Sequence, residues 1–210
     1  MAEQKAAGWN RRDFFSGAAL LALAVGIPMA VVRYSDLDPT EEPSDRQRAM
    51  IAGVSQLVIP RTDTAGAGDV GVGDFVVLAL AHGLEGSRAP VALDAMPNLA
   101  SHRRQDGSLR HLDWLEMQLD QRAAGDFQKA DRGRRVAALA ALDGEAFAEG
   151  VRDHPWRTIK ALILTGYYTS EVGGSKELNY ELVPGRWDPD VPLTPGDRAY
   201  SSDWTAVDFG

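Results

Sequence analysis

The stretch PWRTIKALILTGYYTS, residues 155–170, decides the fold of this chain. Proline suits the first position of a helix, where its missing N–H is not needed. Behind it, apolar side chains recur with the 3.6-residue period of a helix that buries one face. The spacing predicts a helix from Pro155 to about Ser170, with these residues in the core: Trp156, Ile159, Leu162, Ile163, Gly166 and Tyr167.

Four further helices are predicted upstream, at residues 45–58, 72–82, 108–122 and 130–142. Ser44 and Gln47 have the spacing of a capping box at the start of the first. In the fourth we expect Val136, Leu139, Ala140 and Leu142 to face the core, with Gly144 ending the helix. The fold class is therefore mostly α, an irregular domain of about five to six helices.

The chain divides into four parts by composition. Residues 1–32 form a basic and apolar leader, and residues 33–44 an acidic linker with two prolines. The helical domain spans residues 45–170. Residues 171–210 contain four prolines, several aromatic residues and almost no regular period, which predicts a long irregular C-terminal arm.

Composition excludes several kinds of site. The 210 residues carry a formal net charge of -8, which repels a phosphate backbone and argues against nucleic-acid binding. The chain has no cysteine, so disulfides, thiolate zinc sites, iron–sulfur clusters and haem attached through Cys-x-x-Cys-His are all excluded.

The leader has the pattern of a twin-arginine export signal. Arg11 and Arg12 precede the aromatic pair Phe14 and Phe15, and a weakly hydrophobic run follows at residues 17–32. A helix that spans a membrane needs about 20 apolar residues, and this run is shorter. The cleavage site near Ala30 is poor, so retention of the run as an uncleaved inner-membrane anchor is open. We expect a periplasmic location, reached by the pathway that exports folded proteins.

No self-contained catalytic site is predicted. Residues 66–71 match G-x-G-x-x-G, but the segment before them is patterned as a helix, whereas a dinucleotide fold needs a strand there. A glycine-rich connector is the favoured interpretation. The histidines do not have metal-binding spacing. We predict no catalytic, cofactor or metal-binding residue in this chain.

The end of the last predicted helix and the arm have the composition of a protein interface. Tyrosine and tryptophan bury large rigid surfaces at low entropic cost and are enriched in binding hot spots. Half-buried tyrosines at a helix end are the plainer alternative. We favour partner contact through Tyr167, Tyr168, Ser170, Glu171, Tyr180, Trp187, Tyr200 and Trp204.

The order of these segments resembles the gluconate 2-dehydrogenase subunit 3 family. The similarity rests on the twin-arginine leader, on LVIPRTDTAGA at residues 57–67, on Gly73-Asp74-Phe75, on TGYYTSE at residues 165–171, and on Leu178 and Tyr180 ahead of Pro184-Gly185. It covers about residues 10–187. The resemblance implies a small subunit of a bacterial membrane-associated flavoprotein dehydrogenase that acts on sugars, glycosides or sugar acids.

The same resemblance implies a division of labour. A large subunit of the glucose-methanol-choline type would bind FAD and hold the catalytic base, while the small subunit would supply the export signal and keep its partner export-competent. A multihaem cytochrome c subunit accepts the electrons in many relatives. Two other functions stay open: a self-standing periplasmic nucleotide-binding oxidoreductase, and a simple membrane anchor subunit.

Overall fold

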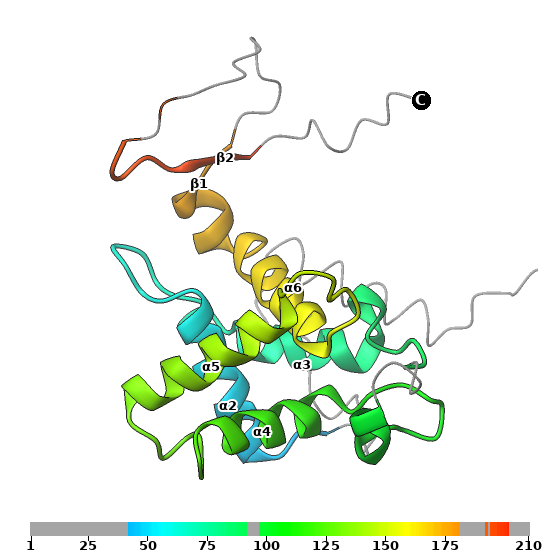
Figure 1. The fold of residues 1–210 in the computed structure, drawn as a ribbon. Helices are drawn as coiled ribbons and strands as arrows, with labels where there is room; N and C mark the ends of the chain where they lie inside the picture. The colour runs from blue at the N-terminus through cyan, green and yellow to red at the C-terminus, as the bar shows by residue number, and fades with distance from the viewer. Residues whose placement is uncertain (1–41, 92–96, 181–191, 193, 202–210) are drawn as a thin grey trace, which may run out of the picture.

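A computed structural model describes residues 42–91, 97–180, 192 and 194–201 (Figure 1). Over these residues the chain is mostly α-helical, as the sequence predicts. The core is a single cluster of apolar side chains to which all five long helices contribute.

Helices α2 (Asp45–Val58) and α3 (Val72–His82) have the predicted bounds. The capping box at α2 is present: the Gln47 amide N–H donates to the Ser44 hydroxyl oxygen, and the Gln47 side chain accepts from the Ser44 amide. Helix α3 is buried on nearly every side because it packs against both α2 and α6.

Helix α4 (His111–Arg122) begins three residues later than predicted. Asp106 accepts hydrogen bonds from the amide and the hydroxyl of Ser108, at 2.9 and 2.6 Å. Leu109 then pairs with Arg103 in an isolated antiparallel bridge. These local contacts hold residues 106–109 outside the helix, although the buried Leu109 fits the helical apolar period.

Helix α5 (Arg132–Ala146) differs from the prediction in its end and in its orientation. It runs through Gly144, which does not stop it. Leu139 and Leu142 face the core as expected, but the expectation for Val136 and Ala140 is wrong, since both are exposed. The helix carries apolar residues around most of its circumference, so periodicity alone could not select the buried face.

Helix α6 (Pro155–Tyr168) is the predicted one, two residues shorter at its end. Its six predicted core residues are buried. Gly166 is there for a packing reason, because a Cβ at this position would lie 2.6 Å from the ring of Phe75 on α3. The glycine therefore lets α3 and α6 approach closely.

Five short elements complete the described part of the chain. The 3-10 turns η3 (Leu84–Gly86) and η4 (Pro97–His102) precede α4. After α6 comes a π-helical turn, η5 (Gly173–Glu177), and then strand β1 (Leu178–Tyr180), which pairs in parallel with β2 (Ala199–Ser201) in the register Leu178 to Ala199. The described part of the arm is thus more regular than the sequence predicts, and it projects away from the helices (Figure 1).

Among the residues that the structure describes, no helix is long and apolar enough to cross a membrane. The predicted leader, residues 1–32, and most of the linker lie outside those residues.

Candidate functional site

Two segments that are about 100 residues apart in the sequence meet at one end of the helical domain. They are the loop between α2 and α3, residues 59–71, and the C-terminal end of α6. The Tyr167 hydroxyl donates a hydrogen bond of 2.9 Å to the backbone carbonyl of Ala65. Tyr167 as a residue is only 1% exposed, and the hydrogen bond lies at the partly buried edge of the core.

Glu177 extends this contact into the arm. One of its carboxylate oxygens lies 3.4 Å from the Tyr167 hydroxyl and 3.5 Å from the Thr62 hydroxyl, which makes both hydrogen bonds long. Burial, reinforced by the negative charge of Glu177, raises the pKa of the Tyr167 hydroxyl. The hydroxyl therefore stays protonated and acts as a donor, which suits a structural tie between loop, helix and arm.

The glycine-rich loop uses its backbone amides internally. The Gly66 amide donates to the Asp69 carboxylate at 2.9 Å, and the Gly68 amide donates to the Gln56 side chain at 2.8 Å. The Ala67 amide donates to the Ile59 carbonyl. A loop that binds phosphate needs such amides to point at the ligand. These contacts therefore fit a connector between two helices better than a nucleotide cradle.

Close packing explains the glycines of this loop. A Cβ on Gly66 would lie 2.7 Å from the Arg61 amide nitrogen, and a Cβ on Gly68 would lie 2.8 Å from the Ala52 carbonyl oxygen. Gly71 has a φ of 79°, in the left-handed region, where it caps α3. The G-x-G-x-x-G pattern thus serves the local fold.

Asp69 holds the loop together electrostatically. It pairs with Arg61 at 2.7 Å. The hydrogen bond from Arg61, followed by that from the Gly66 amide, lowers the pKa of the Asp69 carboxyl. The tip of the loop stays exposed at Pro60, Arg61, Thr62 and Asp63.

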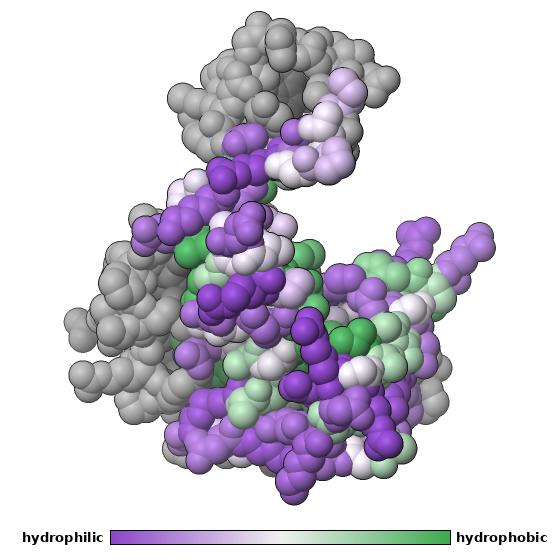
Figure 2. Space-filling model, turned by 90° about the vertical axis from the view of Figure 1, so that its left-hand side faces the viewer, coloured by the Kyte–Doolittle hydropathy of each residue, from purple (hydrophilic) through white to green (hydrophobic). Residues whose placement is uncertain are grey.

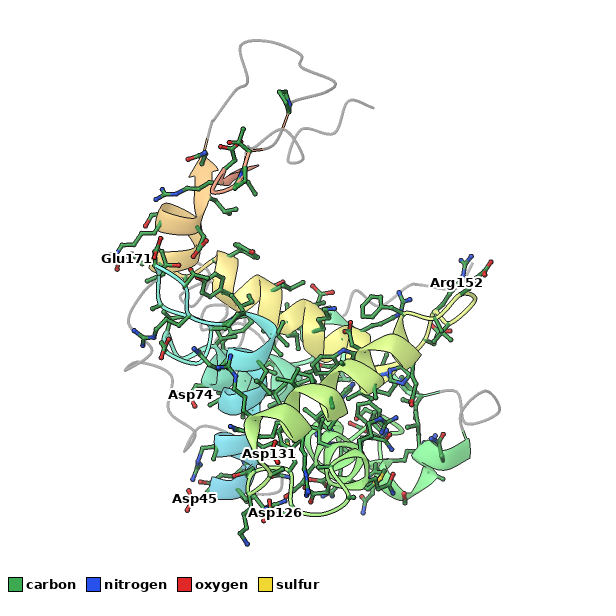
Figure 3. All side chains as sticks on the ribbon, turned by 60° about the vertical axis from the view of Figure 1, so that its left-hand side comes forward. Asp45, Asp74, Asp126, Asp131, Arg152 and Glu171 are labelled. Atoms are coloured by element: carbon green, nitrogen blue, oxygen red, sulfur yellow. The ribbon has the colours of Figure 1, made fainter. Side chains whose placement is uncertain are left out.

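The surface beside this tip is formed by the residues around the end of α6. Tyr168 is 41% exposed, and Thr169 and Glu171 are exposed too. Figure 3 shows Glu171 at the junction between α6 and the arm, next to the loop. The loop tip and this helix end belong to the two segments that the hydrogen bond between Tyr167 and Ala65 joins. We call their exposed residues the junction surface: Arg61, Thr62, Asp63, Tyr168, Thr169 and Glu171.

The four predicted interface residues at the end of α6 have different environments. Tyr168 and Glu171 lie on the junction surface, whereas Tyr167 lies in the core beneath it. The Ser170 hydroxyl donates to the Tyr167 carbonyl at 2.6 Å and accepts from the Gly173 amide, so it caps the end of the helix.

The remaining predicted residues belong to the arm and the leader. Tyr180 is in strand β1 and Tyr200 in strand β2. Tyr180 pairs with Ser201, the residue after Tyr200. These predicted residues lie outside the described part of the chain: Trp187, Trp204, Arg11, Arg12, Phe14 and Phe15.

Two of the described histidines, His111 and His154, have structural environments. His111 is buried, and its Nδ1 lies 3.0 Å from the Leu109 carbonyl oxygen, which requires the proton on Nδ1. Burial lowers the pKa of His111 to about 4. His154 caps α6 by accepting from the Trp156 amide. In the described ranges no three His, Cys, Asp or Glu side chains gather where they could hold a metal ion.

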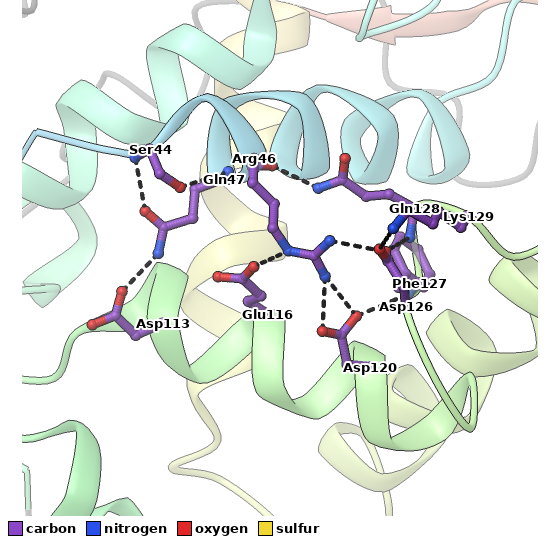
Figure 4. Close-up of polar contacts among 10 residues, drawn as sticks. All are labelled: Ser44, Arg46, Gln47, Asp113, Glu116, Asp120, Asp126, Phe127, Gln128 and Lys129. Atoms are coloured by element: carbon purple, nitrogen blue, oxygen red, sulfur yellow. Dashed lines mark hydrogen bonds and ion pairs between the residues drawn. The ribbon is translucent and has the colours of Figure 1, made fainter.

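A charge cluster at the other end of α2 escaped the sequence prediction (Figure 4). Arg46 pairs with Asp126 at 2.9 Å, with Asp120 at 2.8 Å, and with Glu116. Asp120 also accepts from the Phe127 amide. The cluster ties α2 to α4 and to the loop before α5, so its role is structural. Only the spacing of Glu116 and Asp120 on one helix face signalled it in the sequence.

Comparison with known protein families gives one match. Residues 45–185 match the family model of gluconate 2-dehydrogenase subunit 3. The chain belongs to this family. Comparison with curated proteins and with solved structures finds no match.

The family match includes the helical domain, η5 and β1. The two sequence segments that contain the residues of the junction surface, 57–67 and 165–171, fall inside the match. The resemblance drawn from the sequence is thus confirmed for these segments. The family takes its name from a subunit of a dehydrogenase complex, so the chain is related to proteins that are one part of an assembly.

Proposed function

We propose that the chain is a non-catalytic small subunit of an FAD-dependent dehydrogenase that acts on a sugar, a glycoside or a sugar acid. Its large partner, of the glucose-methanol-choline type, would bind FAD and carry out the oxidation. The small subunit would stabilise the partner and export it as a folded complex by the twin-arginine route. The complex would work in the periplasm, released or held at the inner membrane through residues 11–32, and a multihaem cytochrome c would accept its electrons.

One observation carries this proposal: the two segments by which the chain resembles its family come together on the junction surface. Tyr167 and Gly66, which are buried, contribute to the packing of the two segments, and their exposed members include a tyrosine, Tyr168. Such a surface has the composition of a docking site. The satisfied amides of the loop and the structural roles of His111 and His154 favour docking over catalysis.

The export part of the proposal is tested by expressing the flavoprotein with and without this chain. We expect periplasmic, FAD-loaded activity only when both are present. Replacing Arg11 and Arg12 by lysine should leave both subunits in the cytoplasm. Active flavoprotein in the periplasm without the small subunit would end the escort proposal.

The docking part is tested with two variants of α6. Tyr168→Ala should weaken the affinity for the flavoprotein by about 10-fold or more, as expected for an aromatic hot spot. Leu164→Ala is the matched control, because Leu164 is also exposed, at 38%, but lies one turn before the junction surface. Equal affinities of the two variants, measured by calorimetry on the purified subunits, would contradict docking at this surface.

A further inference from the structure

The outer side of α5 is apolar where a solvent-facing helix is normally polar. Val136 is 46% exposed and Phe147, which caps the helix, is 47% exposed. Beside Val136 an apolar groove of about 240 Å³ runs between α5, α6 and the end of α2, lined by Leu57, Val58, Val136, Leu139, Ala140, Asp143, Trp156 and Lys160. Figure 2 shows apolar residues interrupting a largely hydrophilic surface on one side of the molecule.

Small residues fill the space between these two large ones. At 100° per residue, those within the helix lie on one side of it, opposite the buried side chains of Leu139 and Leu142, whereas Ala148 follows the C-cap Phe147 and lies outside the helix. All of them are exposed: Gly133, Ala137, Ala140, Ala141, Gly144 and Ala148. A face of this kind lets the backbone of a second helix approach closely.

The sequence of this face is symmetric about its middle. When an identical helix packs antiparallel with its two-fold axis between Ala140 and Ala141, Ala137 meets Gly144 of the copy and Ala140 meets its Ala141. Each pair joins two small residues. An interface with a two-fold axis requires this kind of self-complementarity.

The residues flanking the small ones also match across the axis. On one side, Val136 lies beside Phe147 of the copy, so the two exposed large apolar side chains cover each other. The Phe147 ring already has the Arg157 guanidinium carbon at 4.3 Å and the Lys160 nitrogen at 4.6 Å from its centroid. On the other side, Arg134 lies beside Glu145 of the copy, which gives opposite charges at both ends of the contact.

The charges of α5 are reversed relative to the helix dipole. Three arginines lie in its first turn, at positions 132, 134 and 135, while Asp143 and Glu145 lie near its C-terminal end. A helix dipole favours the opposite arrangement. Some of these charges are already compensated within the chain. Asp131 is the N-cap and pairs with Arg134, Glu145 pairs with Arg122, and Asp143 pairs with Lys160. An antiparallel helix of the same sequence brings acidic residues to the basic end and basic residues to the acidic end.

We infer that the outer face of α5 is a homodimer interface, on which a second copy of this chain packs antiparallel about a two-fold axis between Ala140 and Ala141. The inference goes beyond the proposed function, because it concerns self-association and uses a different element from the junction surface. The dimer would present two junction surfaces, one from each copy, so the complete assembly would have two-fold symmetry. A single helix pair is at the small end of specific interfaces, so the dimer is expected to be of modest affinity.

Cysteine cross-linking tests the two-fold axis, since the natural chain has no cysteine. In the Ala141→Cys variant the two new cysteines lie on either side of the axis. Their Cα atoms are expected to be less than about 7 Å apart, which a disulfide tolerates. Oxidation of the purified full-length chain, free or bound to its flavoprotein, should give a covalent dimer. Gln121→Cys, at an exposed position on α4, is the control and should stay monomeric on a non-reducing gel.

The register is tested by mixing two variants. Ala137→Cys alone and Gly144→Cys alone should form little dimer, because each residue lies away from its own symmetry mate. The mixture should form a mixed disulfide. Cross-linking that is equal in all combinations would mean random collision and would overturn the register.

The association itself is measured by sedimentation over a range of concentrations. Ala141→Glu places two carboxylates side by side at the axis and should raise the dissociation constant at least about 10-fold. Gln121→Glu adds the same charge elsewhere and should leave it unchanged. A wild-type chain that is monomeric at about 100 µM would overturn the inference. The inference would also be overturned if the Ala141→Glu variant no longer bound the flavoprotein but still self-associated, because the outer face of α5 would then be the binding site for the flavoprotein.

Discussion

Gly66 and Gly53 differ in what surrounds them, although both lie near helix α2. A Cβ on Gly66 would meet the Gln56 side chain and the Arg61 and Ile59 backbone at 2.6–2.7 Å, whereas nothing lies within 4 Å of one on Gly53. We expect Gly66→Ala to lower the free energy of unfolding by about 2 kcal/mol or more. Gly53→Ala, inside the helix, should raise it by about 0.5–1 kcal/mol. Urea unfolding of the two variants checks this, and equal effects would contradict the packing argument.

His111 makes the stability depend on pH in the weakly acidic range. Its pKa is about 4 in the folded chain and near 6.5 when unfolded, so the unfolded state binds more protons between these values. The stabilisation is complete above about pH 6.5 and is lost as the pH falls to about 4, by up to about 3 kcal/mol.

The variant His111→Asn tests the contribution of this group. Its amide can still donate to the Leu109 carbonyl but does not titrate. The free energy of unfolding, measured in urea from pH 7 to pH 4, should fall less steeply in the variant than in the wild type. Parallel curves would show that other groups cause the slope.

Single residues also mark the limit of prediction from sequence. The capping box of Ser44 was readable because it is local, and so was Pro155 at the start of a helix. The role of Tyr167 was not, because its hydroxyl bonds to Ala65, 102 residues away in the sequence. Two adjacent tyrosines at a helix end look alike in a sequence, and only the packing separates the buried Tyr167 from the exposed Tyr168.

At the scale of elements, the Arg46 cluster joins three segments. The hydrogen bond from Arg46, followed by that from Lys129, lowers the pKa of Asp126 to about 2. A carboxyl with a depressed pKa contributes stability above its unfolded pKa, near 4, and loses it as the pH falls towards 2. We expect Asp126→Asn to be less stable than the wild type at pH 7 and equally stable at pH 2. A difference that persists at pH 2, in urea unfolding at both values, would assign the effect to packing.

The helices were predictable where one face alone is apolar. Helices α2 and α6 have this pattern, and the predicted bounds agree to within two residues. Helix α5 has alanines on both sides, so the sequence left its orientation undecided and the prediction for Val136 was wrong. The short strands β1 and β2 were not predictable, because their pairing joins residues about 20 positions apart without an alternating pattern in either strand.

At the scale of the whole molecule, the helical domain and the arm are joined mainly through α6 and η5. The elements that contact β1 most are β2 and η5. A chain that ends after Glu177 keeps the Tyr167 and Thr62 contacts of that residue. We therefore expect it to melt cooperatively within about 3 °C of the full-length chain, because the truncation removes none of the core residues found in the described part of the chain.

The same truncated chain should bind the flavoprotein more weakly if the arm contributes to the interface. Calorimetric melting and a binding titration on one preparation separate the two effects. A large loss of melting temperature would show that the arm stabilises the domain, and unchanged binding would restrict the contact to the junction surface.

The deep burial of two indole rings has a practical consequence. Trp114 and Trp156 are 2% and 1% exposed, in the centre of the helical domain. Their fluorescence should be emitted at short wavelength while the domain is intact and shift to the red when water reaches them. These two side chains are thus an intrinsic optical probe of core integrity, and no dye has to be attached.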